Sequence, residues 1–544
     1  MIKKIIQISV IRFNVLLSII CFVIITSCLS KQSRLDDSKI FRYNEFKNVT
    51  SLDPAFARNP QNIWPIQQLF NALVQLDDSL NVKPEIAKKW EISKNGLEYT
   101  FTLRNDVYFH NSVLFKNSIT RKVVADDFTY SFNRLKDKKI ASPGGWVLQN
   151  VEEFKAKNDS IFKIKLKKPF PAFLALLSMR YCSVVPMEVV DFYKEDFRNN
   201  PIGTGPFKFK RWEENVKLVL RKNKNYFETD LNGRKLPFLE SISISFLPDI
   251  QSEFMLFTQG KLDFLNSIDN SYKDDLLTPN GDLQEKYKAN IKMLKGPYLN
   301  TEYIGFYLKS ESKAVKSKLI REAINIGFDR KKMISYLRNN IGFPADQGFI
   351  PRGLPGHKVL DSIKYNPKKA KKLVNEFISE NKIIPSIKLA TDANYVDICE
   401  YIQRELEKIG IQITIDIMPT ATLRQLKSNG NLEAFRASWI ADYPDAENYL
   451  SLFTSKNHSP QGPNYTHYEN SYFDSLYNIS IGINNIKERI EIYSKMNSLI
   501  MDSLPIIPLY YDQSTRFIHK NVKNIGINPI NLIQLKNVYK DTFQ

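Results

Sequence analysis

The sequence predicts a mixed α/β fold built from several units in one chain. Segments with apolar side chains at every second position alternate with segments whose apolar side chains recur three or four positions apart. Of the 544 residues, 43% are apolar and 25% are charged. This composition indicates a globular protein that buries sizeable cores, and it excludes a mostly disordered, a collagen-like or a multi-span membrane protein.

Strands and helices are predicted from these two periods. Four strands are indicated by apolar residues alternating with polar ones: Tyr99, Phe101 and Leu103; Phe162, Ile164 and Leu166; Ile242, Ile244 and Phe246; Ile411, Ile413, Ile415 and Ile417. One helix is indicated by the stripe Ile398, Ile402, Leu406 and Ile409. Another is expected to begin at Pro367 with Asn366 as its cap, and its lysines between 368 and 372 should form a solvated face.

Residues 1–27 are typical of a secretory signal peptide. Three basic residues precede a nearly continuous apolar run over 15–25, which has about half the length of a membrane-spanning helix. The sequence Ile-Thr-Ser-Cys at 25–28 resembles a bacterial lipobox, in which the Cys28 thiol receives a diacylglycerol. We expect an extracytoplasmic protein that is anchored to the membrane by a lipid at Cys28, with a polar tether over 28–39. An uncleaved anchor and simple signal cleavage are the alternatives.

The charge pattern and the cysteine content bear on nucleic-acid binding and on disulfide formation, respectively. Lys and Arg number 77 and Asp and Glu 58, so the net charge is +19. Because the lysines are spread along the whole chain without an Arg-rich arm, a zinc finger or an RNP-like strand, a solvated basic surface is favoured over nucleic-acid binding. For Cys182 and Cys399, two buried thiols are favoured over a disulfide.

Nothing in the sequence points to an enzyme, a metal site or a cofactor. The five histidines are scattered, and the H-E-x-x-H, G-x-S-x-G, Walker A and C-x-x-C motifs do not occur. His458 and His467 share a polar stretch, but a metal site is not predicted there. Asp126 and Asp127 are adjacent, which fits the start of a helix better than a pair of catalytic carboxylates.

Four sequence blocks follow one another along the chain: SLDP at 51–54 with QLFNAL at 68–73; IAKKWEIS at 86–93 with GLEYTFTLR at 96–104, FH at 109–110 and ADDF at 125–128; PIGTGPF at 201–207 with NYF at 225–227; WIADYPD at 439–445. Together they resemble the bacterial extracellular solute-binding proteins of family 5, the oligopeptide, dipeptide and nickel receptors of ABC importers, and most closely the oligopeptide binders. The Gly-Thr-Gly-Pro turn at 203–206 is expected to use dihedrals that glycine allows, before a strand that starts at Phe207.

The resemblance implies a two-lobed clamshell like a type II periplasmic binding protein, with an extra inserted domain. Residues 40–76, 200–300 and 515–544 would form lobe I, residues 77–199 the inserted domain, and residues 301–514 lobe II. The ligand would lie between the lobes, and closure about hinges near 300 and 515 would bury it. The closed protein, a monomer, would then dock on a membrane permease driven by an ATPase.

The resemblance also implies site residues. Asp442 takes the place at which oligopeptide binders hold the carboxylate that receives the peptide's ammonium, with Trp439 and Tyr443 beside it. Arg436 takes a place from which some of them meet the ligand's carboxylate, and Asn394 replaces a histidine that helps to do so. The residues alone leave open a solvated or helix-capping Asp442, a core role for Trp439 and an internal salt bridge for Arg436.

Other positions depart from the family pattern. Thr420 replaces an aromatic pocket wall, and Asn300 and Ile440 replace a disulfide that some members have. The predicted function is a substrate-binding lipoprotein of an ABC importer that captures short peptides. The alternatives are the same fold with a nickel chelate, haem or an oligosaccharide, or a surface lipoprotein that acts as a peptide sensor, chaperone or adhesin without transport.

Overall fold

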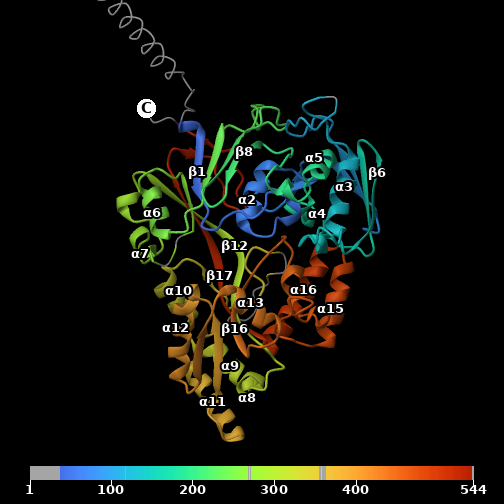
Figure 1. Cartoon of the computed structure of the whole chain (residues 1–544). Helices are drawn as coiled ribbons and strands as arrows, with labels where there is room; N and C mark the ends of the chain where they lie inside the picture. The colour runs from blue at the N-terminus through green and yellow to red at the C-terminus, as the bar shows by residue number, and fades with distance from the viewer. Residues whose placement is uncertain are drawn as a thin grey trace, which may run out of the picture.

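The computed structural model describes residues 37–541, apart from residues 117, 268, 270, 355, 356 and 358–362. It has two lobes, which lie above and below one another in Figure 1. The predicted signal peptide, the lipidation site Cys28 and most of the predicted tether lie outside the described residues. Within the described part of the chain, no helix has the length and apolar character needed to cross a membrane.

An eleven-stranded sheet runs through both lobes in the order β15-β14-β16-β12-β17-β11-β1-β10-β9-β8, with β13 paired to β17. In the upper lobe it contains β1 (Ile40–Asn44), β8 (Phe207–Glu213), β9 (Lys217–Lys222), β10 (Ser241–Ser245) and β11 (Phe264–Asn266). In the lower lobe it contains β13 (Phe343–Pro344), β14 (Ser386–Thr391), β15 (Gln412–Ile417) and β16 (Ala434–Ile440). The antiparallel strands β12 (Ile291–Phe306) and β17 (Ile506–His519) pass from one lobe to the other.

A separate four-stranded sheet lies at the far side of the upper lobe, with its strands in the order β4-β5-β7-β6. These strands are β4 (Ala87–Ile92), β5 (Glu98–Leu103), β6 (Val151–Asn158) and β7 (Ile161–Leu166). The remaining strands pair in two short hairpin-like units: β2 (Val74–Leu76) with β3 (Val82–Pro84), and β18 (Val522–Lys523) with β19 (Tyr539–Lys540).

Helices cover the sheets of both lobes. The upper lobe has α2 (Pro60–Leu69), α3 (Ala125–Lys136), α4 (Phe173–Leu176), α5 (Met187–Tyr193), α6 (Ile250–Thr258) and α7 (Lys273–Leu276). The lower lobe has α8 (Lys313–Lys316), α9 (Lys318–Gly327), α10 (Arg330–Arg338), α11 (Pro367–Asn381), α12 (Val396–Glu407), α13 (Thr420–Ser428), α14 (Glu447–Leu450), α15 (Ser471–Gly482) and α16 (Ile486–Ser503). Short 3-10 turns used below are η2 (Pro54–Phe56), η4 (Arg180–Cys182) and η7 (Ala393–Tyr395).

The strands and helices predicted from periodicity are confirmed. The four predicted strands are β5, β7, β10 and β15, and the stripe from Ile398 forms the buried face of α12. Helix α11 starts at Pro367, and the Asn366 side chain accepts the Lys369 N–H at 2.9 Å. One alternating residue departs from the pattern: Ile417, at the end of β15, is 56% exposed. Cys182 and Cys399 are free and buried, as favoured.

Residues of the first three sequence blocks make polar contacts in the upper lobe. Asp53 accepts two hydrogen bonds from the Arg134 guanidinium, at 3.1 and 2.7 Å, and both side chains are buried. The Asn71 side chain accepts from the Thr204 hydroxyl at 3.0 Å. Asp126 and Asp127 lie in the first turn of α3, as expected, and Asp127 accepts from the Val124 N–H at 2.9 Å. Of these contacts, the bond between Asn71 and Thr204 joins the first block to the third.

The explanation given for the Gly-Thr-Gly turn is wrong. Neither Gly203 nor Gly205 has a positive φ angle. The reason for glycine is close packing, because a Cβ on Gly203 would lie 2.1 Å from the Leu69 carbonyl oxygen and one on Gly205 would lie 2.4 Å from that of Gln68. The strand that follows, β8, begins at Phe207 as predicted.

The predicted division into lobe I, inserted domain and lobe II stays a prediction. The pairing of β12 with β17 is irregular between Pro297 and Thr301 and between Glu302 and Tyr303, which is where the first hinge is predicted. Asn300 and Ile440, the positions of the missing disulfide, lie directly opposite one another on β12 and β16.

Candidate ligand-binding site

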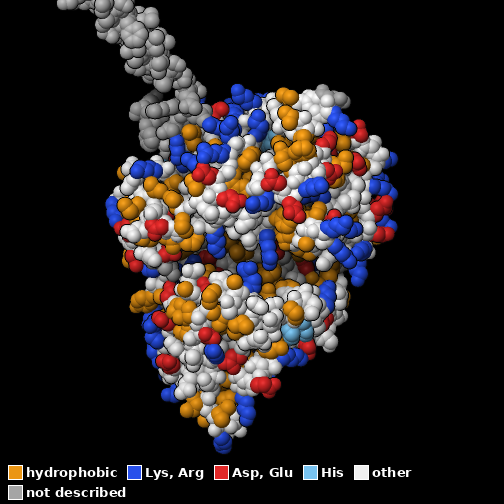
Figure 2. Space-filling model, viewed as in Figure 1, with side chains coloured by type: hydrophobic (Ala, Val, Ile, Leu, Met, Phe, Trp, Pro, Cys, Tyr) orange, Lys and Arg blue, Asp and Glu red, His pale blue; other side chains and the backbone are white. Residues whose placement is uncertain are grey.

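The predicted site residues come together at one edge of the lower-lobe sheet. Strands β14, β15 and β16 run parallel, so their carboxyl ends meet at one edge, which is where ligands bind in open α/β sheets. Asn394 lies in η7, after β14, and Asp442 follows β16. Figure 2 shows a hollow between the two lobes, with Lys and Arg side chains around it on the face in view.

Asp442 has the features of a ligand-binding carboxylate. Its Oδ2 accepts a 3.4 Å hydrogen bond from Asn448, which also accepts the Asp442 N–H at 3.2 Å and the Trp439 indole N–H at 2.9 Å. No lysine, arginine or histidine in the described part of the chain forms an ion pair with Asp442. The residue is exposed to water. Desolvation by the neighbouring protein atoms raises the pKa of Asp442, although the Asn448 hydrogen bond acts in the opposite direction.

Asp442 faces the upper lobe. Burial raises the pKa of Tyr181, in η4 of the upper lobe, to about 12, and the negative charge of Asp442 contributes to that rise. The next residue, Tyr443, is buried against two aromatic side chains of the upper lobe, Trp146 at 6.4 Å and Phe170 at 6.1 Å between ring centroids. The loop that carries Asp442 therefore lies at the junction of the lobes.

Buried polar contacts hold this loop in place. Asp445 accepts hydrogen bonds from Arg489 and from the Tyr493 hydroxyl, both at 2.8 Å. Glu447 accepts hydrogen bonds from the hydroxyls of Tyr443 and Tyr477. Asp445, rather than Asp442, accepts the N–H of Glu447, the first residue of the short helix α14, at 3.0 Å. Asp442 is therefore not engaged at the start of this helix.

Arg436 has the internal ion pair that the sequence left open. It is 7% exposed, donates to Glu302 of β12, and lies 3.8 Å from an oxygen of Asp392. Its guanidinium stacks on Tyr395, 3.0 Å from the ring centroid. Burial raises the pKa of Glu302, while the positive charge of Arg436 acts in the opposite direction. Contact between Arg436 and a ligand carboxylate stays a prediction.

The other predicted residues differ in how they are placed. Asn394 is exposed and directly precedes Tyr395, the residue on whose ring the Arg436 guanidinium lies. Trp439 is half-buried and packs against a lower-lobe core, which fits the core role that the sequence left open. Thr420 is exposed at the start of α13. Ligand contacts by these residues stay predictions.

A polar network and a small cavity lie where the lobes meet near β12 and β17. Asn300 donates to Glu302 at 3.0 Å and to Asp512 at 3.4 Å, and Arg338 donates to Asp512 at 2.6 Å. The adjoining cavity has a volume of about 250 Å³ and is lined by residues of both lobes, among them Ser267, Tyr298 and Arg338.

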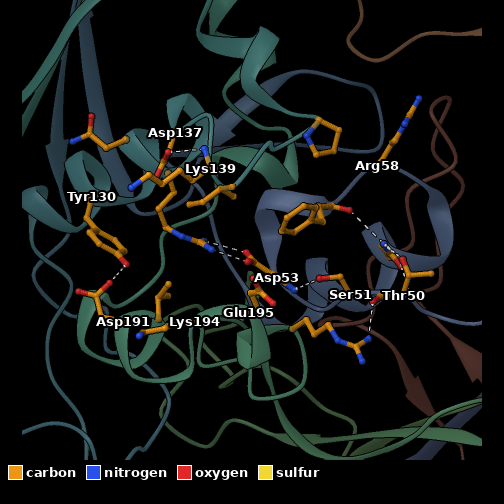
Figure 3. Close-up of a pocket in the computed structure, with 18 of the residues that line it drawn as sticks. Thr50, Ser51, Asp53, Arg58, Tyr130, Asp137, Lys139, Asp191, Lys194 and Glu195 are labelled. Atoms are coloured by element: carbon orange, nitrogen blue, oxygen red, sulfur yellow. Dashed lines mark hydrogen bonds and ion pairs between the residues drawn. The ribbon is translucent and has the colours of Figure 1, made fainter.

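A larger cavity lies elsewhere, in the upper lobe. It has a volume of about 1290 Å³, and its lining contains none of the five predicted ligand-binding residues (Figure 3). Two of its acidic groups have partners within the lining: Asp53 pairs with Arg134, and the Tyr130 hydroxyl donates to Asp191 at 2.6 Å. Arg58, however, points away from these pairs.

Sequence analysis did not find several residues near the site. Tyr181 and Arg58 come from the upper lobe, and Arg424, Lys427 and Tyr465 from the lower lobe. The signal that could have found Arg424 and Lys427 is their position on a helix that starts three residues after β15, at the edge where Asp442 lies.

A sequence profile of the bacterial extracellular solute-binding proteins, family 5 (middle region), matches residues 81–461. The chain belongs to this family. The family 5 protein is 29% identical over 492 residues to Heme-binding protein A of Haemophilus influenzae, with 85% of each chain covered. It is 24% identical over 494 residues to the dipeptide-binding protein of Escherichia coli K12, with 86% of this chain and 88% of the relative covered.

The fold of this family 5 protein is also that of solved binding proteins. It matches the periplasmic binding protein DppA of Helicobacter pylori, solved with the peptide STSA, with a TM-score of 0.77 and 23% identity. That match covers 92% of this chain and 98% of the other. The predicted family and the two-lobed α/β fold are therefore confirmed.

Proposed function

We propose that this family 5 protein is the substrate-binding lipoprotein of an ABC importer and that it captures short peptides between its lobes. The expected ligand carries a free ammonium, which Asp442 receives. Relatives named for dipeptides and a solved relative with a bound peptide support this choice of ligand.

The observation that carries the proposal is the unpaired carboxylate of Asp442. It is exposed at the junction of the lobes, and among the described residues no cation neutralises it. A ligand ammonium would supply the missing charge, and closure of the lobes over the ligand would exclude water and strengthen the attraction. Peptide backbones can add further affinity as strands at the sheet edge.

Titration calorimetry on the chain from Leu29 onward tests this assignment. Mixed di- to hexapeptides should bind when their N-terminus is free and should lose about 30-fold or more in affinity when it is acetylated. Asp442→Asn should show the same loss for the free peptides. The matched control is Glu400→Gln on α12, whose side chain is 50% exposed, and it should bind as the wild type does. Equal binding of free and acetylated peptides would refute the role of Asp442.

Haem is the alternative that the similarity to Heme-binding protein A favours. Haem has no ammonium, so its binding would not require Asp442. An absorbance titration with haem on the wild type and on Asp442→Asn separates the two ligands. If the absorbance change on adding haem saturates and no peptide gives a binding heat in calorimetry, haem would replace peptides as the proposed ligand.

Membrane anchoring is part of the same proposal and has its own test. Lipid attachment at Cys28 would keep the protein on membranes after cell fractionation, and Cys28→Ala would release it. Membrane retention of the variant would argue against lipidation at this cysteine.

A further inference from the structure

An open basin on the upper lobe, called the lysine basin below, is lined mostly by lysines. It has a volume of about 860 Å³, and the charged residues of its lining are five lysines and one aspartate: Lys288, Lys292, Lys295, Lys520, Lys523 and Asp282. The other residues of the lining are the apolar Leu283, Ile291 and Met293. None of the five predicted ligand-binding residues lines the basin, so it is not part of that site.

Two of the five lysines have no acidic partner among the residues that the structure describes. Lys292 lies on β12 opposite Ile518 of β17, and Lys520 directly follows β17; both are exposed. The other three lysines form ion pairs with acids whose side chains are between 53% and 86% exposed: Lys288 with Glu285 at 2.9 Å, Lys295 with Asp282 at 3.5 Å, and Lys523 with Asp541 at 3.4 Å. Because exposed pairs of this kind bind weakly, these ammonium groups can also turn to another anion.

The lysine basin lies close to the start of the described chain. The turn η1 (Asp37–Lys39) leads into β1 and contacts β19. Lys540 of β19 donates to the Ile40 carbonyl at 3.1 Å, and β19 pairs with β18, whose last residue is Lys523 of the basin. In Figure 1 the start of β1 lies at the end of the molecule away from the lower lobe, and Figure 2 shows Lys and Arg side chains gathered at this end.

A lipid at Cys28 would hold this end of the molecule near a bilayer. Asp37 comes nine residues after Cys28, and a fully extended chain spans at most about 3.6 Å per residue, so Asp37 would lie within roughly 30 Å of the lipid. Anionic phospholipids attract lysines at their surface, and this attraction decays over a Debye length of about 8–10 Å. Lysines at the tethered end of the molecule are therefore the ones that can reach the headgroups.

We propose that the lysine basin binds the phosphate headgroups of an anionic phospholipid bilayer and so orients the tethered protein on the membrane. The proposal rests on the anchoring part of the proposed function, because the lipid at Cys28 is what brings the basin to the bilayer. An ammonium offers three donors without a fixed direction, which suits headgroup phosphates that present themselves at different angles. Contact at this end would leave the lower lobe, at the other end of the molecule in Figure 1, clear of the membrane and free to close on a ligand.

Co-sedimentation with vesicles tests the basin without the lipid anchor. The protein is the chain from Leu29 onward, which contains every described residue. The vesicles are made of phosphatidylcholine alone or of phosphatidylcholine mixed with phosphatidylglycerol, which carries a negative charge. At low ionic strength the protein should sediment only with the charged vesicles, and added salt should release it because salt screens exposed charges.

Two matched double variants separate the basin from the net charge of the chain. Lys292→Gln combined with Lys520→Gln removes the two unpaired lysines and should weaken binding to the charged vesicles roughly 25-fold, at about fivefold per lysine. Lys368→Gln combined with Lys372→Gln removes the same charge from the exposed face of α11 in the lower lobe and should bind nearly as the wild type does. Thermal melting confirms that each variant folds.

Three results would overturn the proposal. The first is an absence of binding to the charged vesicles at low ionic strength, and the second is an equal loss in the two double variants, which would assign the attraction to net charge alone. The third is displacement from the vesicles by inorganic phosphate too dilute to change the ionic strength, which would assign the basin to a dissolved phosphate compound. A high-salt wash before the Cys28→Ala fractionation removes basin contacts, so failure of the lipid anchor and failure of the basin can be told apart.

Discussion

Asp442 and Asp445 lie three positions apart in one loop, and their surroundings predict opposite effects of the same substitution. Asp445 is buried and binds Arg489 and the Tyr493 hydroxyl, each at 2.8 Å. Asp442 has no cationic partner in the described part of the chain, and burial raises its pKa. We expect Asp445→Asn to lower stability and Asp442→Asn to lower ligand affinity.

The size of each effect follows from these contacts. Asp445→Asn leaves the 6%-exposed Arg489 without its counter-charge, which costs about 3–5 kcal/mol of unfolding free energy. For Asp442→Asn we expect no loss of unfolding free energy. Because its folded pKa is raised, the ionised carboxylate is less favourable in the folded chain than in the unfolded one, so the neutral amide should leave stability unchanged or raise it at neutral pH.

Urea denaturation and calorimetry of both variants at pH 7 measure the two quantities side by side. Glu400→Gln provides the baseline for loss of an exposed charge. The reasoning would be refuted if Asp442→Asn destabilised the fold as much as Asp445→Asn, because the Asp442 carboxylate would then have a structural partner. It would also be refuted if Asp445→Asn were neutral.

Two further predictions concern the upper lobe. His110 is neutral in the fold, since its Nδ1 accepts from the Gly203 N–H at 3.3 Å and its Nε2 bonds the Gly205 carbonyl at 3.0 Å, and burial lowers its pKa to about 4. Between pH 6.5 and 5 only the unfolded chain gains the proton, so unfolding free energy should fall by about 2 kcal/mol, and His110→Gln should lack this part of the pH dependence in urea titrations. Gly205→Ala should cost about 1–3 kcal/mol through its clash with the backbone at Gln68, whereas Gly482→Ala, with open space around it, should be neutral; equal thermal stabilities would contradict the packing argument.

Local patterns in the sequence were sufficient to predict several of the secondary-structure elements. Side chains that alternate in polarity must place one face against a core, which is why β5, β7 and β10 could be predicted from their residues. Asn366 and Pro367 determined the start of α11, because an N-terminal cap needs only neighbouring atoms. The ordered motif blocks identified the family, which carries the two-lobed fold with it.

The sequence also identified Asp442 as a candidate, through its place in the last block. It could not decide between a ligand contact and an internal salt bridge for Arg436, since the answer depends on Glu302, which lies 134 residues away and on a neighbouring strand. In the same way, Tyr443 turned out to pack against Trp146 and Phe170 of the other lobe.

What the sequence by itself determined is therefore the set of elements and the family, and it supplied Asp442 as the candidate for one end of the proposed site. Only the tertiary structure decided which charged side chains form ion pairs and which do not. It paired Arg436 with Glu302 and Asp445 with Arg489, and it left Asp442 and Lys427 without counter-charges among the described residues. The physical reason is that the periodic pattern of apolar residues can be recognised from neighbours in the sequence. The energy of an ionised side chain depends instead on the charges and dipoles that surround it in space.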